Sequence, residues 1–416
     1  MKPSSALLAV LLAASAAASA QVVPAVEGPT GLPISGTLHY SLDYTQTAQF
    51  YGGSEGTVQR GVVSGELAYA NSSSIRPFGV TYSGGDIFNI SGEPEGTGVF
   101  QHMLVSQGLG GREWMLKLMD EVSYMPQAPV SGFSGIVGVG GLPSPPTLPI
   151  EPILTQESRS VFNTVGPDLT RTFGRATSLD FGGKYTILRF PDSNGLDTDS
   201  VQANGQITRR LDARNSLTGQ YVYGYTSFPG YSVLTMDTQS GLFGYQRVWN
   251  RQFKMSLAAG PEWVQSTDNL LVPPSTNVTV NATASYDLRS TSAMVSYNRA
   301  TSGSAGEAQE VGIHVDDVSG AVSQIFGRNW TVTATGSYMR TQGVALQLND
   351  QVVLTNAEFG GLTAMRRLSR HFTASANYTA IQQSSNFGLG PNVVSGLSQV
   401  ISFTVAYSPR DINLKK

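Results

Sequence analysis

Cysteine is absent from the 416-residue chain. The protein can therefore form no disulfide, bind no iron–sulfur cluster, carry no lipid on sulfur and use no thiol nucleophile. In an exported protein, this absence also removes any chance of wrong oxidation outside the cytoplasm. The four histidines and the scattered carboxylates show no metal-ligand spacing, so neither a metal nor another cofactor is expected.

Charged residues are scarce as well. They make up 13% of the chain, against about 25% in ordinary soluble proteins. The net charge of −3 gives no strong field of either sign, so a nucleic-acid partner is not expected. Ser, Thr, Asn and Gln supply the polar groups instead. This composition suits a wall that faces lipid on one side and a neutral, wet lumen on the other.

The chain also lacks a long apolar run. Lys2 and the short apolar stretch Ala6–Ala14 precede Ala18-Ser19-Ala20, which is a small-residue cleavage pattern. Residues 1–20 are therefore expected to be a secretory signal peptide, and residues 21–33 a periplasmic segment of the mature protein. A transmembrane anchor is the alternative, but it needs about 20 apolar residues, roughly twice the length present here.

A turn rich in Arg and in Asn or Ser recurs about every 40 residues, and a unit of this length holds two membrane-spanning strands. The clear examples are Phe173–Arg175, Leu211–Asn215, Trp249–Arg251, Asp287–Arg289, Gly327–Asn329 and Leu368–Arg370, with further ones near Ser74–Arg76 and Gly110–Arg112. With both chain ends on one side, these turns predict about eighteen strands, short periplasmic turns and longer outer loops. Sixteen strands is the alternative, because residues 100–124 and 159–172 are poorly patterned.

Between the turns, side chains alternate with period two. Val278, Val280, Ala282, Ala284 and Tyr286 share one predicted face, opposite Asn, Thr and Ser. The stretches from Trp330, Phe372 and Ile401 repeat this alternation, with aromatic residues at the ends of the apolar faces. A soluble sandwich alternates equally well, but its strands are shorter and its apolar faces bulkier. The pattern predicts an all-β fold: a transmembrane, antiparallel, up-and-down β-barrel over residues 34–408, with membrane lipid as a partner.

One segment breaks the repeat. Residues 125–157 contain a Gly-rich apolar middle and many prolines, which remove backbone donors from a sheet: Pro126, Pro129, Pro143, Pro145, Pro146, Pro149 and Pro152. An inserted loop is therefore expected, and long loops of this kind are usually functional or disordered. If it folds inward it could narrow the lumen, and the candidate constriction residues are Phe133, Ile136, Val137 and Pro143.

A catalytic site is not expected. His314 and Asp316 stand at strand spacing on one predicted face, which allows a hydrolase at the barrel rim. No nucleophile motif accompanies them, so a polar pair in the lumen or rim is the preferred interpretation. The turn arginines similarly allow a cationic ring, but anchoring at the lipid headgroups, with help in fixing the turns, is preferred.

The mature chain resembles a family of porin-like outer-membrane β-barrel proteins from acidobacteria. The resemblance is carried by Gly132–Gly135, Leu188–Asp199, Thr208–Leu217 and Val405–Arg410. It implies a barrel in the outer membrane of a Gram-negative bacterium, and it offers no catalytic residues to assign to this chain. Tyr407 fits the terminal aromatic residue that barrel assembly machinery recognises in such proteins. Residues 409–416 follow it and are expected to form a short periplasmic tail.

Three functions remain open from the sequence. A passive pore for small polar solutes is preferred, because a barrel of this size encloses a water-filled lumen. Export of a polysaccharide is the first alternative, since neutral sugars suit a lumen rich in hydroxyls and amides. A structural or adhesive surface barrel is the second. The sequence determines neither the oligomeric state nor the solute.

Overall fold

The computed structural model describes residues 36–51, 57–71, 73, 75–92, 97–125, 159–191, 196–230, 234–268, 272–304, 311–344, 354–385, 396–410 and 412–413. The strands are β1 (Thr37–Tyr51), β2 (Thr57–Asn71), β3 (Phe78–Ser91), β4 (Gly98–Gly110), β5 (Trp114–Met125), β6 (Ser160–Phe173), β7 (Thr177–Arg189), β8 (Thr198–Arg210), β9 (Asn215–Ser227), β10 (Thr235–Val248), β11 (Phe253–Ser266), β12 (Ser275–Asp287), β13 (Thr291–Ser304), β14 (Val311–Phe326), β15 (Trp330–Gly343), β16 (Leu354–Arg367), β17 (Phe372–Ser385), β18 (Gly396–Tyr407) and the short β19 (Ile412–Asn413).

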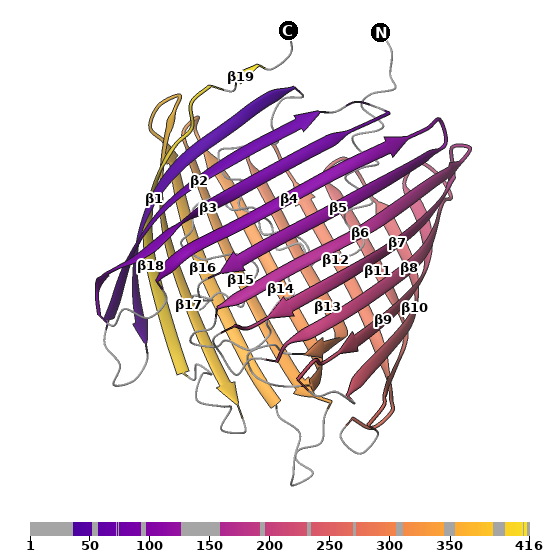
Figure 1. Cartoon of the computed structure of the whole chain (residues 1–416). Helices are drawn as coiled ribbons and strands as arrows, with labels where there is room; N and C mark the ends of the chain where they lie inside the picture. Colours follow the sequence, from indigo (N-terminus) through magenta and orange to yellow (C-terminus); the bar gives the residue numbers. More distant parts are fainter. Residues whose placement is uncertain are drawn as a thin grey trace, which may run out of the picture.

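These strands form one closed antiparallel barrel (Figure 1). Each strand from β1 to β18 pairs with its neighbour in sequence, and β18 pairs back to β1 with Leu42 opposite Tyr407. Closure leaves no sheet edge, which is the requirement for strands in lipid. The prediction of eighteen strands is confirmed for the described residues, and the alternative of sixteen is wrong. Among these residues, no helix is long and apolar enough to cross a membrane.

The connections differ between the two ends of the barrel. The short ones lie at the predicted positions, between β2 and β3, β4 and β5, and so on to β16 and β17. The end that carries them is called the turn end, and β1 begins and β18 finishes there. The longer connections lie at the opposite end, called the loop end. The predicted positions of the short turns are therefore confirmed.

Small polar side chains fix several of these turns. Asp212 accepts hydrogen bonds from the backbone N–H groups of Arg214 (2.6 Å) and Asn215 (2.9 Å). These bonds, together with one from the Asn215 side chain, lower the pKa of the Asp212 carboxyl below its ordinary value. Asn250 and Ser369 accept backbone N–H groups in the same way. The turns are thus closed by Asp, Asn and Ser rather than by the neighbouring arginines.

The wall has its apolar side outward. Phe403 is 61% exposed, whereas its neighbour Thr404 is 8% exposed; Val278 and Thr279 differ in the same way. Because neighbours on a strand point to opposite faces, the exposed apolar side chains lie outside and the buried hydroxyls inside. This inverted pattern is the one predicted from residues 277–286 and 401–407, and it matches a wall that is solvated by lipid.

Two details were not predicted. The tail folds back, since Ile412 and Asn413 pair with Leu38 and Thr37 at the start of β1. Proline also occurs inside strands: Pro167 in β6 and Pro261 in β11. The β6–β7 ladder has no pairs between Val165/Tyr185 and Asp168/Gly182, and the β10–β11 ladder has a matching gap opposite Pro261. Each proline is therefore accommodated by a local break in pairing.

Candidate functional site

The interior of the barrel is polar and carries more carboxylates than cations. On the described strands, away from their ends, the inward face holds Asp43, Glu66, Glu121, Asp168, Asp180, Glu262 and Asp317 against Arg60, Lys117 and Lys184. Around them lie hydroxyl and amide side chains such as Thr45, which shares a hydrogen bond of 2.8 Å with Thr404. The inner wall is therefore hydrophilic with an acidic bias.

One acidic patch lies on β1 and β2. Asp43 is opposite Ser64, and Glu66 is opposite Ser41, so both carboxylates point inward among buried hydroxyls. The two carboxylates repel each other, and Glu66 also interacts with His39 on the same face. This patch places two carboxyl groups about halfway along the inner wall.

A mixed patch lies on β4 to β7. His102 and Glu121 are both buried, with His102 Nε2 4.0 Å from Glu121 Oε1. Lys184 interacts electrostatically with Glu121 and with Asp168, and Lys117 lies directly opposite Asp168. Cations and carboxylates alternate here, so this side of the lumen is close to neutral.

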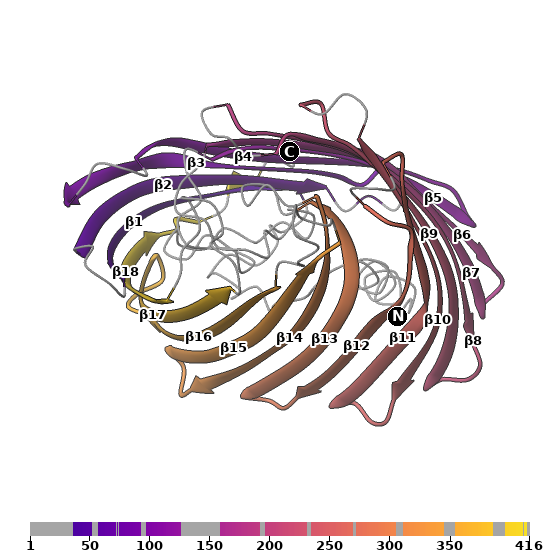
Figure 2. The same cartoon turned by 90° about the horizontal axis from the view of Figure 1, so that it is seen from below.

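The loop end narrows on the side opposite the mixed patch. There β13 separates from β12, while β14 stays paired with both β13 and β15. The β12–β13 ladder stops at Val280 and Arg299, although β12 continues toward the loop end and β13 runs on to Ser304. The β13–β14 ladder itself continues to its end. We call residues 300–304 and 311–315 the inturned tip. Figure 2 shows the ribbons of this hairpin curving into the area that the wall encloses.

Polar contacts hold the inturned tip against the inner face of β11 and β12. Thr301 on β13 donates to Glu262 Oε2 on β11 at 2.5 Å, and its Oγ1 lies 2.8 Å from His314 Nδ1. His314 Nε2 lies 3.0 Å from Asn277 Nδ2 on β12. The amide nitrogen can only donate, so Nε2 accepts and Nδ1 carries the proton that it gives to Thr301. The contacts with Glu262 and with Asn277 each skip one strand of the barrel, as expected where one layer lies on another.

Apolar contacts continue the same interface. A Cβ on Gly312 would lie 3.0 Å from Met236 Sδ of β10, which is four strands away in the wall. Gly312 has a φ of 68°, a conformation that favours glycine. The surrounding residues form a buried group, called the loop-end cluster: Leu196, Phe228, Leu234, Met236, Val264, Val272 and Val344. Through this cluster, the inturned tip packs against strands β10 and β11.

His314 and Asp316 are on one face, as the sequence predicted, but they have different partners. Asp316 accepts from Tyr297 at 2.9 Å and lies 3.7 Å from Arg299 Nε. His314 belongs to the Glu262 network instead. No nucleophile is placed between them among the described residues. Their role in the structure is to hold the hairpin, which corresponds to the rim-pair interpretation.

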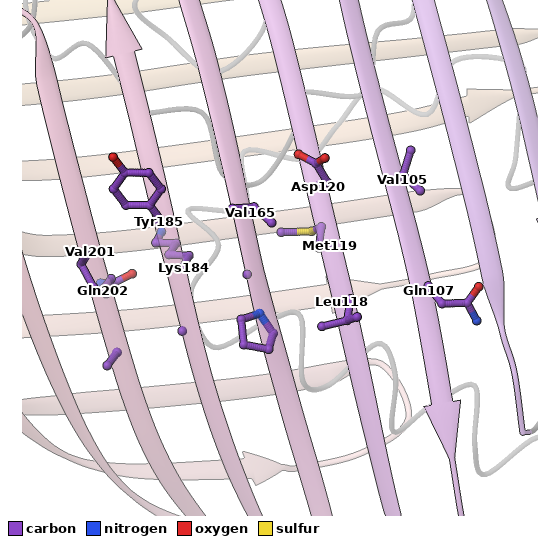
Figure 3. A pocket seen from close by; sticks show the side chains of 14 residues that line it. Val105, Gln107, Leu118, Met119, Asp120, Val165, Lys184, Tyr185, Val201 and Gln202 are labelled. Carbon is purple, nitrogen blue, oxygen red and sulfur yellow. The ribbon is translucent and has the colours of Figure 1, made fainter.

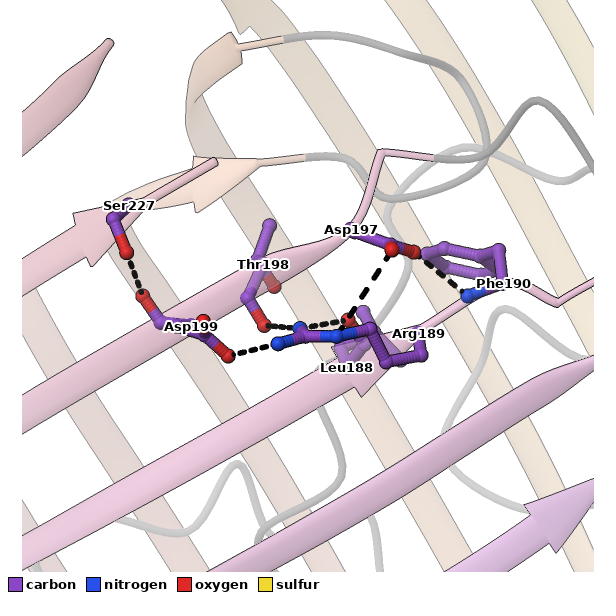
Figure 4. Close-up of polar contacts among 7 residues, drawn as sticks. All are labelled: Leu188, Arg189, Phe190, Asp197, Thr198, Asp199 and Ser227. Carbon is purple, nitrogen blue, oxygen red and sulfur yellow. Dashed lines mark hydrogen bonds and ion pairs between the residues drawn. The ribbon is translucent and has the colours of Figure 1, made fainter. Parts of the chain in front are cut away.

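Arg189 fastens a second loop-end connection, the one between β7 and β8 (Figure 4). Its Nη2 donates to Asp199 Oδ1 at 2.6 Å, and its Nη1 donates to the carbonyl oxygen of Thr198 at 2.8 Å. Asp197 lies 3.9 Å from Arg189 Nε and accepts the backbone N–H of Phe190 at 2.9 Å. This arginine is fully engaged by the protein.

A groove of about 530 Å³ lies against β4 to β8, where Pro167 and Gly183 interrupt the ladder. Most of its side chains belong to the outward face of the wall, including Val105, Val165 and Tyr185 (Figure 3). The groove is therefore on the lipid side rather than part of the interior path.

The predicted constriction residues Phe133, Ile136, Val137 and Pro143 lie outside the described residues, so their role stays a prediction. Sequence reasoning missed the inturned tip. Glu262, Asn277 and Thr301 come from three different strands. Each of these strands has the same regular alternation of polar and apolar residues as the rest of the wall, so nothing in the sequence pairs them. The one available signal was Gly312, which breaks the run of side chains next to His314.

Comparisons with known proteins give only a loose likeness of shape. The crystal structure of OpdQ from Pseudomonas aeruginosa has 11% identity, with 90% of this chain and 98% of that chain covered and a TM-score of 0.45. OccK2 (OpdF) from the same organism has 11% identity, with 91% of this chain and 98% of that chain covered and a TM-score of 0.48. The ferric yersiniabactin uptake receptor FyuA from Yersinia pestis has 7% identity, with 92% of this chain and 81% of that chain covered and a TM-score of 0.43. No family model and no curated protein sequence matches the chain.

Proposed function

We propose that the protein is a passive pore for small polar solutes in the outer membrane of a Gram-negative bacterium. The observation that carries this proposal is the arrangement of the closed wall, with apolar side chains outside and hydroxyl, amide and charged side chains inside. An outward apolar band requires lipid, and an inward polar face requires water. A closed barrel of this size has room for both a lumen and a constriction.

The turn end faces the periplasm in this proposal, because short turns and chain ends lie on that side of such barrels. Residues 1–20 would then be removed as a signal peptide, and residues 21–33 and 409–416 would lie in the periplasm. The loop end faces outward. The inturned tip would then lie at the outer mouth.

The inner wall favours cations and neutral solutes over anions. Asp43 and Glu66 place two carboxylates side by side on β1 and β2, and Glu262 and Asp317 add charge beside the hairpin. Rings and patches of carboxylates select for cations at close range. The mixed patch on β4 to β7 contributes little net charge.

Single-channel recording in planar lipid bilayers tests the proposal. Purified barrels whose folding is checked by heat-modifiable gel migration should give stepwise, ohmic currents in potassium chloride. A heat-denatured sample of the same preparation is the control and should give none. Folded barrels that insert but never conduct, including after the inturned tip is shortened, would contradict the proposal.

A further inference from the structure

Arginine is concentrated at the turn end of the barrel. Every short turn carries one: Arg76, Arg112, Arg175, Arg214, Arg251, Arg289, Arg328 and Arg370. All of these side chains are exposed. In a chain with few charges, this ring is the densest group of cations in the described residues. We call it the arginine rim.

Aromatic side chains place the arginine rim relative to the membrane. Arg247 lies over the ring of Trp249 at 3.9 Å, Arg171 over Phe173 at 4.7 Å and Arg366 over Trp330 at 5.3 Å. These aromatic rings are exposed on the outer surface where the strands meet the turns. Tyr and Trp at such positions mark the level of the lipid headgroups. The turn arginines therefore stand at or just beyond the headgroups.

At the loop end, by contrast, two arginines are paired with carboxylates. Arg189 binds Asp199 and Arg299 lies beside Asp316. Among the described residues, no ion pair is recorded for an arginine of the rim, and few carboxylates are near it. One of these, Asp212, is occupied by backbone N–H groups of its own turn. Within the described residues, the arginine rim thus presents exposed guanidinium groups for which no ion pair is recorded, although Arg214 interacts electrostatically with Asp212.

We propose that the arginine rim binds the phosphate groups of anionic phospholipids in the periplasmic leaflet. A guanidinium presents planar N–H donors that match phosphate oxygens, and the neighbouring aromatic rings fit the boundary between acyl chains and headgroups. Lipid is favoured over an acidic protein because the cations encircle the barrel at one depth and alternate with membrane-facing aromatic residues. The proposal rests on the membrane location given above, but not on conduction.

The tryptophans allow a direct test within one chain. Trp249 lies at the turn end and Trp263 near the loop end of the outer surface, where it is also exposed. Two single-tryptophan barrels, each with the other three tryptophans changed to Phe, are reconstituted in vesicles of phosphatidylcholine. A fixed fraction of brominated phosphatidylglycerol is then added, and quenching of each tryptophan is compared with quenching by brominated phosphatidylcholine.

Quenching by the anionic lipid should be enriched at Trp249 and not at Trp263. An enrichment of roughly fivefold is expected for a lipid held by one arginine near the surface. The triple variant R214Q/R251Q/R289Q should remove the enrichment, the corresponding Arg→Lys variant should restore part of it, and Arg340→Gln at the loop end should leave it unchanged. Soluble phosphate should not displace it, since a lipid is also held by its chains.

Equal enrichment at both tryptophans, or enrichment that survives the triple variant, would overturn the proposal. Loss of enrichment in soluble phosphate would identify a free phosphate site instead. The absence of any lipid preference would leave an acidic protein as the rim's partner and would also overturn the proposal. If a single-tryptophan barrel fails to fold, native mass spectrometry of the unmodified protein replaces it. Retention of phosphatidylglycerol no greater than that of phosphatidylcholine would then be the contrary result.

Discussion

The two ends of the barrel differ in their connections and in the residues that stabilise them. The turn end consists of similar short turns, each with an exposed arginine. Three of these turns are closed by hydrogen bonds to the side chains of Asp212, Asn250 and Ser369. The loop end has an inturned tip, a buried apolar cluster and arginines paired with carboxylates. Regular anchoring at one end and irregular closure at the other suggest a division of labour. In the proposed function, the turn end anchors the barrel in the membrane and the loop end restricts entry.

The largest effect on stability is expected in the loop-end cluster. Met236 is 1% exposed and faces Gly312 across the inturned tip. Met236→Ala should lower the free energy of unfolding by about 2–5 kcal/mol, because it leaves a cavity between two layers. Urea unfolding in detergent micelles measures the change. The matched variant Leu362→Ala, on the lipid face, should cost clearly less; an equal cost would show that the hairpin does not pack on β10.

Removing the polar link of the inturned tip should have a smaller effect on stability and a visible one on conduction. Thr301→Val leaves Glu262 and His314 without their shared hydroxyl, which costs about 1–3 kcal/mol for buried polar groups. The tip should then sample the open position more often, which gives larger and noisier single-channel currents. Thr283→Val, which removes a hydroxyl bond to Ser256 on the same sheet, is the control. Unchanged currents in Thr301→Val would show that the position of the hairpin does not affect conduction.

Charge selectivity should change moderately when the acidic patch is neutralised. The double variant D43N/E66Q removes two inward carboxylates from β1 and β2. Under a potassium chloride gradient, the reversal potential should move toward zero from the cation-selective side. Neutralising Lys117 by K117Q should move it in the opposite direction. An anion-selective unmodified pore would refute the assignment of charge but not the pore itself.

The smallest effect is expected at a single turn. The pKa of the Asp212 carboxyl is lowered mainly by the hydrogen bond from the Asn215 side chain and by the one from the backbone N–H of Arg214. A carboxyl with a lowered folded-state pKa stabilises the protein above its unfolded pKa of about 4, and this contribution is lost as pH falls through the folded value. Asp212→Ala should therefore be slightly less stable at neutral pH, and the difference should vanish in strong acid. Urea midpoints measured at both pH values provide the check.

Much of this fold follows from local sequence. The turn at Leu211–Asn215 has its own chemistry, because Asp212 needs only the next residues to close it. Strand faces such as Val278 against Thr279 likewise follow from alternation, once lipid is the solvent. The inturned tip does not follow, since Thr301 and Glu262 are partners on strands that are not neighbours. Pro167 and Pro261 sit in strands for a related reason: the residues before them, Gly166 and Gly260, lack a Cβ that would clash with the carbonyl oxygens of Gly183 and Gly241 on the facing strands.

The residues of the inner wall distinguish less well between the alternative functions. Export of a polysaccharide and a structural surface role remain predictions, because hydroxyl and amide side chains such as Thr45 and Thr404 suit sugars and water alike. The assignment to the acidobacterial family also remains a prediction. Only a property that depends on an open lumen distinguishes a pore from a barrel that serves as a surface scaffold.

Single-channel conductance of the unmodified barrel beside a variant with a shortened inturned tip tests the central claim most directly. Replacing residues 302–313 by a tight Asn-Gly turn removes the hairpin end without touching the turn end. The unmodified barrel should conduct, and the variant should conduct more, by a factor on the order of two, because the mouth is wider. Folded barrels of both kinds that carry equal currents, or no current, would contradict the account.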